Sequence, residues 1–240
     1  MEEFSELKSA RLLSIYARLL NRRVLKKALL AQEFGVTARS IQRDLESLRS
    51  FLSNEMLPQD VVYDRAAGGC RLTHARPNEK WLTDVIEFKW YEGNKIHKLY
   101  LSAILDLCDR RIVSYVLGEH NNNPLVFKTF DKAVLANPDA HPLFHSDRGF
   151  QYTNRTFHHK LVQAGMTQSM SRVAHCIDNG PMEGFWGILK RERYYGRRFT
   201  SKHELVQMIQ QYIRYYNTRR VQRNLGLLTP MEKHELCSAA

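Results

Sequence analysis

Three strand-like segments in the middle of the chain constrain the fold most. Residues 81–90 (WLTDVIEFKW), 98–107 (KLYLSAILDL) and 110–118 (RRIVSYVLG) are rich in apolar and β-branched residues and are separated by short polar turns. Segments with helical and extended patterns then alternate up to residue 217. Strands that come first, with helices interleaved afterwards, predict an α/β fold in which a mixed sheet is flanked by helices.

The first 74 residues follow a different pattern. Residues 7–21 and 24–34 have helical apolar spacing, Gly35 interrupts it, and Thr37 is placed to cap a third helix. Two short strands around Gly68-Gly69 follow. We therefore predict a winged helix-turn-helix domain over 1–74, a linker over 75–80 and a second domain over 81–240. The outward face of the third helix offers candidate DNA contacts, namely Arg39, Ser40, Gln42 and Arg43. The alternative is a helical bundle whose exposed helix is merely solvated.

The distribution of charge suits a polyanionic partner. The chain has 240 residues and a net charge of +11; residues 1–76 contribute +4, residues 77–182 contribute +1 and residues 183–240 contribute +6. A basic protein without a polyanion is the alternative. The four cysteines have no metal-ligand spacing, and neither a signal peptide nor a membrane-length apolar run is present. These features lead us to expect a cytoplasmic protein with no membrane partner.

Asp84 lies where a strand would be expected to carry an apolar residue. The period of two in residues 81–90 places it on the same face as Leu82, Ile86 and Phe88. An unpaired carboxylate there costs on the order of several kcal/mol, which a divalent cation would offset. A register that leaves this face half-buried, or a salt bridge to an arginine, would explain the residue equally well.

Two further acids have weaker individual signals. Asp147 ends the predicted strand 142–146 (PLFHS), at a position where sites gather, although Asp before Arg-Gly is also a common turn former. Glu183 follows Pro181, which suits the first helical position, so Gly180 is the expected cap. A glutamate there can simply favour the helix N-terminus. However, Glu183 and Lys190 share one helical face and could hold a metal and a phosphate together.

Taken together, these segments resemble a known superfamily. TDVIEF, HSDRGFQY and DNGPMEGFWGILKRE are similar to the three catalytic segments of the DDE integrases and transposases, with 35 residues between Asp147 and Glu183 and with Asn179 and Lys190 also matching. The resemblance covers about residues 77–240. It implies an RNase H-like fold, Asp84, Asp147 and Glu183 as catalytic acids that hold two Mg²⁺ (or Mn²⁺) ions, and DNA contacts from Lys190, Arg191, Arg193 and Asn179.

The N-terminal segment FGVTARSIQRDLESL resembles the winged helix of DeoR-like and WYL-type bacterial regulators. Insertion-sequence transposases usually carry their own helical DNA-binding region before the core, so this chain has the pattern of a fusion. The resemblance of residues 77–240 to DDE transposases implies DNA cleavage and strand transfer. A homo-oligomer would act on double-stranded DNA, both element ends and target. The alternative is a DNA-binding transcriptional regulator in which the integrase-like part serves oligomerisation or docking.

Overall fold

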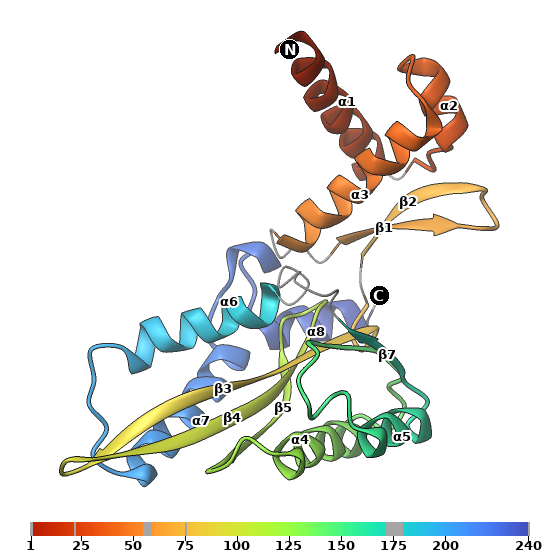
Figure 1. The fold of residues 1–240 in the computed structure, drawn as a ribbon. Helices are drawn as coiled ribbons and strands as arrows, with labels where there is room; N and C mark the ends of the chain where they lie inside the picture. The colour runs from red at the N-terminus through yellow and green to blue at the C-terminus, as the bar shows by residue number, and fades with distance from the viewer. Residues whose placement is uncertain (1, 22, 55–58, 75, 171–179, 240) are drawn as a thin grey trace. The chain divides into compact units, whose positions relative to one another are not determined.

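The computed structural model describes residues 2–21, 23–54, 59–74, 76–170 and 180–239, and it divides the chain into two compact units, Met1–Ala75 and Arg76–Ala240 (Figure 1). In the described part of the chain, no helix combines the length and the apolarity needed to cross a membrane.

The first unit has three helices followed by a two-stranded antiparallel sheet. The helices are α1 (Glu2–Leu20), α2 (Lys27–Glu33) and α3 (Ala38–Asn54), and the strands are β1 (Gln59–Asp64) and β2 (Gly69–His74). Leu25 forms backbone hydrogen bonds with Cys70 in both directions, which ties the chain before α2 to β2. The core contains Ile15 and Leu19 from α1, and Ile41, Leu45, Leu48 and Leu52 from α3.

The turn between α2 and α3 forms for local reasons. Gly35 has a φ of 62°, a left-handed conformation that glycine adopts without steric cost. Thr37 Oγ1 then accepts the backbone N–H of Ser40 at 3.2 Å and caps α3, as the sequence predicts. Inside the unit, Arg11 pairs with the buried Asp44 at 2.6 Å.

The second unit is built on a five-stranded mixed sheet in the order β5-β4-β3-β6-β7. The strands are β3 (Lys80–Glu92), β4 (Lys95–Asp106), β5 (Ile112–Gly118), β6 (Leu143–Ser146) and β7 (Thr167–Met170). Strands β3, β4 and β5 are antiparallel neighbours, whereas β3, β6 and β7 are parallel. The predicted α/β architecture with a mixed sheet is confirmed.

Two groups of helices supply two hydrophobic cores on this sheet. The α-helices described in this unit are α4 (Asn123–Ala136), α5 (Arg155–Gln163), α6 (Gly180–Leu189), α7 (Lys202–Thr218) and α8 (Pro230–Ser238), of which the first four contribute to these cores (Figure 1). Leu82 and Phe88 of β3 share a core with α6 and α7, whereas Trp81 shares the other core with α4 and α5. Alternate residues of β3 therefore serve different cores, as a strand period of two requires.

Two segments differ from the sequence predictions. Residues 76–79, within the predicted linker, form a turn fixed to the second unit: the Asn78 N–H donates to Asp106 Oδ2 at 2.6 Å, and Trp81 Nε1–H donates to Asn78 Oδ1 at 3.2 Å. The predicted single helix 181–195 is α-helical only to Leu189 and continues as a π-helical turn, η2 (Lys190–Tyr194).

Candidate active site

Asp84 sits in the middle of the sheet, opposite Ala103 of β4. Its Oδ1 accepts the N–H of Val85 at 2.7 Å, and its Oδ2 accepts the indole N–H of Trp186 in α6 at 3.0 Å. Both donors are neutral. The side chain is therefore oriented by hydrogen bonds from its own strand and from the helix that carries Glu183.

The pKa of Asp84 is shifted by burial and by groups close to its carboxylate. Burial raises this pKa to about 6, the hydrogen bonds from Val85 and Trp186 oppose the rise, and the negative charges of Asp147 and Glu183 add to it. The fold thus brings three acids, far apart in sequence, into one electrostatic neighbourhood. Among the largest effects on Asp84, none comes from a lysine or arginine of the described residues.

Asp147 follows the last residue of β6 and is exposed. Its Oδ1 accepts the N–H of Gly149 at 2.9 Å, so the turn-forming role that the sequence allows is realised. The turn is attached to the sheet by the buried Tyr152, whose hydroxyl lies 3.2 Å from the Thr83 hydroxyl, one residue before Asp84. This contact places the Asp147 turn beside the middle of β3.

Glu183 is exposed in the first turn of α6. The helix begins at Gly180, one residue before Pro181, so the expected cap is itself helical and the preceding Asn179 lies outside the described residues. Glu183 and Trp186 are three positions apart and share a helix face. Because Trp186 reaches Asp84, this face of α6 is turned toward β3.

Known protein families and relatives match the part of the chain that contains these three acids. Two models of the integrase core domain match, one over residues 74–176 and one over residues 164–230. A transposase-like protein of Haemophilus influenzae is 43% identical over 159 residues, which are 66% of this chain and 72% of that protein.

The chain belongs to the family of transposases with an integrase core. An Escherichia coli protein that carries the name of transposase InsK for insertion sequence element IS150 is 44% identical over 158 residues, 65% of this chain. The match spans 54% of that protein, about half of its length. Both family matches lie within residues 74–230, so the integrase core corresponds to the second unit. This unit is the core of a polynucleotidyl transferase.

Solved structures show the same fold. The catalytic core domain of HTLV-2 integrase, described in complex with magnesium in a trimeric form, superposes with a TM-score of 0.50 and 19% identity, over 66% of this chain and 97% of that one. A simian T-cell lymphotropic virus intasome chain gives a TM-score of 0.54 and 18% identity, over 88% of this chain and 70% of that one. The RNase H-like, integrase-type fold predicted from the sequence is confirmed.

An integrase core implies dependence on a divalent metal. Within the described ranges, no three His, Cys, Asp or Glu side chains form a group that could hold an ion as they stand. In this structure, oxygens of Asp84 and Asp147 accept hydrogen bonds from N–H donors. The donor set nevertheless fits a hard cation, since it consists of three carboxylates, one half-buried and two exposed.

The candidate DNA contacts Lys190, Arg191 and Arg193 all lie in the π-helical turn η2 but differ in exposure. Lys190 is half-buried with its ammonium 5.6 Å from the centre of the Phe88 ring. Burial lowers its pKa, and the negative charge of Glu87 opposes this effect, so the carboxylate acting on Lys190 is Glu87. Arg191 and Arg193 are exposed.

The candidate DNA contacts on α3 differ in exposure and in their hydrogen bonds within the unit. Arg39 and Arg43 are exposed. Ser40 Oγ lies 3.0 Å from Thr37 Oγ1, and Gln42 accepts a hydrogen bond from Lys27 Nζ at 2.9 Å while donating to Glu46. The two arginines are therefore the free cations of this set, whereas the two neutral residues hold neighbouring side chains.

Two residues that position the site, Trp186 and Tyr152, were not predicted from the sequence. Trp186 was assigned no role, although it stands three residues after Glu183 on the same helix face. No sequence signal links Tyr152 to Thr83, which lies 69 positions earlier. A helix-face argument could have found the first, whereas the second depends on the fold.

Proposed function

We propose that this chain catalyses divalent-metal-dependent cleavage of DNA strands and their transfer to target DNA, with Asp84, Asp147 and Glu183 as the catalytic acids. The observation that carries the proposal is the pKa of Asp84, raised to about 6 by burial and by the negative charges of Asp147 and Glu183. A carboxylate whose charged form is disfavoured by burial and by two nearby carboxylates is a natural site for an external cation.

The same three carboxylates would hold two Mg²⁺ (or Mn²⁺) ions. Hard carboxylate oxygens, with water and phosphate completing the ligand set, are what Mg²⁺ prefers. When bound, such ions lower the pKa of a water or a DNA 3′-hydroxyl and stabilise the departing oxygen of an in-line displacement.

The remaining residues of the core position DNA and the acids. Trp186 and the N–H of Val85 orient Asp84, and Tyr152 holds the Asp147 turn against β3. The exposed side chains of Arg191 and Arg193 would neutralise DNA phosphates. Lys190 would contact the DNA close to Phe88. Asn179, matched by the family resemblance, would join this set.

The first unit would serve as a winged helix-turn-helix domain that binds double-stranded DNA. Arg39 and Arg43 on α3 are exposed for phosphate or base contacts, and Ser40 and Gln42 lie between them. The strands β1 and β2 would form the wing. Because strand transfer joins an element end to target DNA, we propose that a homo-oligomer acts on both, in the bacterial cytoplasm on nucleoid DNA.

The decisive experiment uses labelled duplexes that carry element-end sequences. We expect Mg²⁺-dependent nicking that leaves a 3′-hydroxyl, followed by joining to a target duplex. The matched control is Asp147→Asn, which keeps the exposed turn but weakens the metal site. Absence of both products with the wild-type chain, on folded protein and in the presence of Mn²⁺, would exclude the proposal.

A transcriptional regulator is the second candidate, favoured by the exposed arginines on α3 of a separately compact unit. In that case the chain binds a specific duplex equally well in EDTA, and no substrate is cleaved. Arg39→Gln with Arg43→Gln would abolish this binding. The same double variant would weaken end recognition in the transposase, while leaving Mn²⁺-supported nicking of nonspecific DNA in place.

A further inference from the structure

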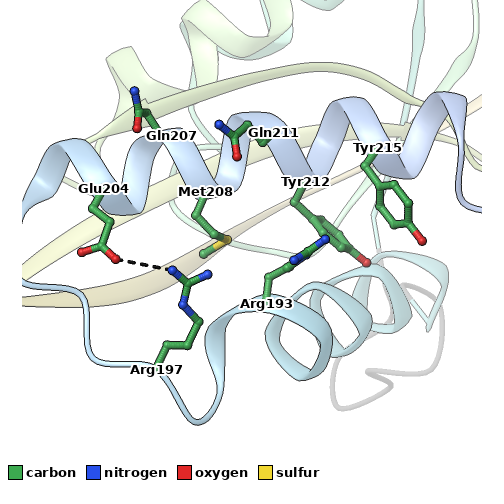
Figure 2. Close-up of a pocket in the computed structure, with 8 residues that line it drawn as sticks. All are labelled: Arg193, Arg197, Glu204, Gln207, Met208, Gln211, Tyr212 and Tyr215. Carbon is green, nitrogen blue, oxygen red and sulfur yellow. Dashed lines mark hydrogen bonds and ion pairs between the residues drawn. The ribbon is translucent and has the colours of Figure 1, made fainter.

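A groove lies between the segment after the catalytic-core helix α6 and the helix α7 (Figure 2). Its volume is about 240 Å³. Arg193 and Arg197 line it from the segment, and Glu204, Met208, Tyr212 and Tyr215 line it from α7. Figure 2 shows both arginine side chains directed toward α7.

The π-helical turn creates the groove. Tyr195 N–H donates to Lys190 O at 2.7 Å, which closes the wide turn. Glu192 then accepts hydrogen bonds from the Tyr212 hydroxyl of α7 at 2.9 Å and from Nη2 of Arg220, just after α7, at 2.7 Å. Because Glu192 anchors the turn in this way, the following Arg193 is held beside α7 rather than beside β3.

The charge of the groove is positive. Arg193 and Arg197 are exposed, and the only acid among the lining residues is Glu204. Glu204 approaches Arg197 Nη2 at 3.4 Å, and its other oxygen accepts the Thr200 N–H at 3.3 Å. The Arg197 guanidinium also lies 4.9 Å from the centre of the Phe199 ring. An exposed pair at 3.4 Å contributes little and can exchange for a phosphate.

The wall on α7 carries Met208 and two tyrosines among the polar side chains of Glu204, Gln207 and Gln211. Met208 and Tyr212 are buried, and Tyr215 is 36% exposed at one end of the groove. Cations on one side and an aromatic surface on the other are the chemistry that binds single-stranded nucleic acid, where phosphates meet guanidinium groups and bases stack. The small volume suits one nucleotide and is too narrow for a duplex.

We propose that this groove binds one unpaired nucleotide of a DNA strand, with its phosphate on Arg193 and Arg197 and its base against Met208 and Tyr215. The choice of DNA as the polyanion rests on the proposed function. An unpaired nucleotide is available wherever a strand is nicked or frayed at an element end. The groove would therefore hold a displaced strand while the core acts on another part of the same DNA.

Photo-crosslinking of the full-length chain tests this proposal. A single-stranded oligonucleotide containing 5-iododeoxyuridine is irradiated with the protein in EDTA, so that no cleavage intervenes, and the crosslinked peptide is identified by mass spectrometry. We expect the crosslink within residues 202–218, which carry Met208 and Tyr215. Arg193→Gln with Arg197→Gln should lower its yield at least about fivefold, and Tyr215→Ala should lower it by a similar factor.

Arg214→Gln is the matched control, since Arg214 is an exposed arginine of the same helix that does not line the groove. We expect it to change the yield less than about twofold. Circular dichroism verifies the fold of each variant. Crosslinks only outside 190–218, equal losses in Arg214→Gln, or displacement by a polyglutamate peptide as readily as by unlabelled oligonucleotide would each overturn the inference. Strand-transfer assays on the same variants separate this outcome from failure of the proposed function.

Discussion

Two clusters of acids in the second unit have opposite electrostatic settings. The first consists of Asp84, Asp147 and Glu183, and the largest effects on Asp84 come from burial, two neutral N–H donors and the other two carboxylates. The second consists of Asp106 and Asp109, both fully buried, where β4 turns into β5. The first cluster gathers negative charge without a partner cation among these effects, whereas the second has cations beside it.

The partners of the second cluster come from several elements. Asp109 accepts the N–H of Arg111 at 2.8 Å and pairs with His234 Nδ1 of α8 at 2.6 Å. Asp106 accepts the N–H groups of Asn78 and Cys108. Burial, followed by the charge of Asp109, raises the pKa of Asp106 to about 7, while these hydrogen bonds and the charge of Arg111 oppose the rise. This cluster ties the chain before β3, the β4–β5 turn and α8 together.

The contrast is the one expected between a structural site and the catalytic site that we propose. A buried acid that serves the fold receives partners from the protein, because an unpaired buried charge is strongly destabilising. The first cluster is only partly buried and has neutral partners, so its charge is available to an external cation. We expect removal of an acid to affect chemistry in the first cluster and stability in the second.

The largest expected effect is a loss of DNA strand cleavage on removal of an acid from the first cluster. Glu183→Gln keeps the size of the side chain but removes its charge, and we expect strand cleavage in Mg²⁺ to fall by on the order of 10³-fold. Asp106→Asn should retain cleavage within about tenfold, because Asp106 contacts no reacting group. The measurement is single-turnover nicking of a labelled duplex. Equal losses in the two variants would remove the distinction between the clusters.

The largest effect on stability should come from Asp109→Ala. It leaves His234 and Arg111 without their buried partner, and we expect the second unit to lose about 3–5 kcal/mol of its free energy of unfolding. The exposed Asp147→Ala should cost less than about 1 kcal/mol. Urea unfolding followed by tryptophan fluorescence reports the second unit specifically, since all three tryptophans lie there. A loss below 1 kcal/mol in Asp109→Ala would contradict a structural role for this cluster.

Asp84→Asn should stabilise the protein at alkaline pH in EDTA. The pKa of Asp84 is raised to about 6 from its usual 3.8, so the folded state holds the proton more tightly than the unfolded state. The contribution of Asp84 to stability therefore falls as pH rises from about 4 to about 6 and stays low above that. At pH 8 the variant should gain about 1–3 kcal/mol over wild type, relative to their difference at pH 4.

Magnesium provides the control for this stability difference. Mg²⁺ at pH 8 should stabilise the wild-type chain, because an ion that binds only the folded state shifts the unfolding equilibrium. The Asp84→Asn variant should respond little. A wild-type chain whose unfolding curve is unchanged by millimolar Mg²⁺ and Mn²⁺ would count against a metal site at the first cluster.

The smallest effect should follow from Trp186→Phe. This substitution keeps the ring in the core but removes the indole N–H that lowers the pKa of Asp84. We expect the titration midpoint of the Asp84 carboxyl, followed by NMR in EDTA, to rise by less than about one pH unit. A midpoint that is unchanged or falls would show that Trp186 does not orient Asp84.

The sequence by itself determined the strands, most of the helices and the chemical character of the site. The alternation in residues 81–90 placed Leu82 and Phe88 on one face of β3, because side chains of a strand alternate between the two faces of a sheet. Gly35 and Thr37 fixed the turn before α3 through local backbone and capping preferences. These are short-range effects, which residue types and spacing can encode directly.

Only the tertiary structure decided which distant groups meet. Asp84 and Trp186, separated by 102 positions in the sequence, are in contact because α6 packs on β3. No local pattern specifies that contact. The π-helical turn that separates Lys190 from Arg193 depends on anchoring of Glu192 by Tyr212 and Arg220. The turn at residues 76–79 and the Asp109–His234 pair likewise depend on long-range packing. Such contacts arise when whole elements dock, because burial and charge compensation act through space rather than along the chain.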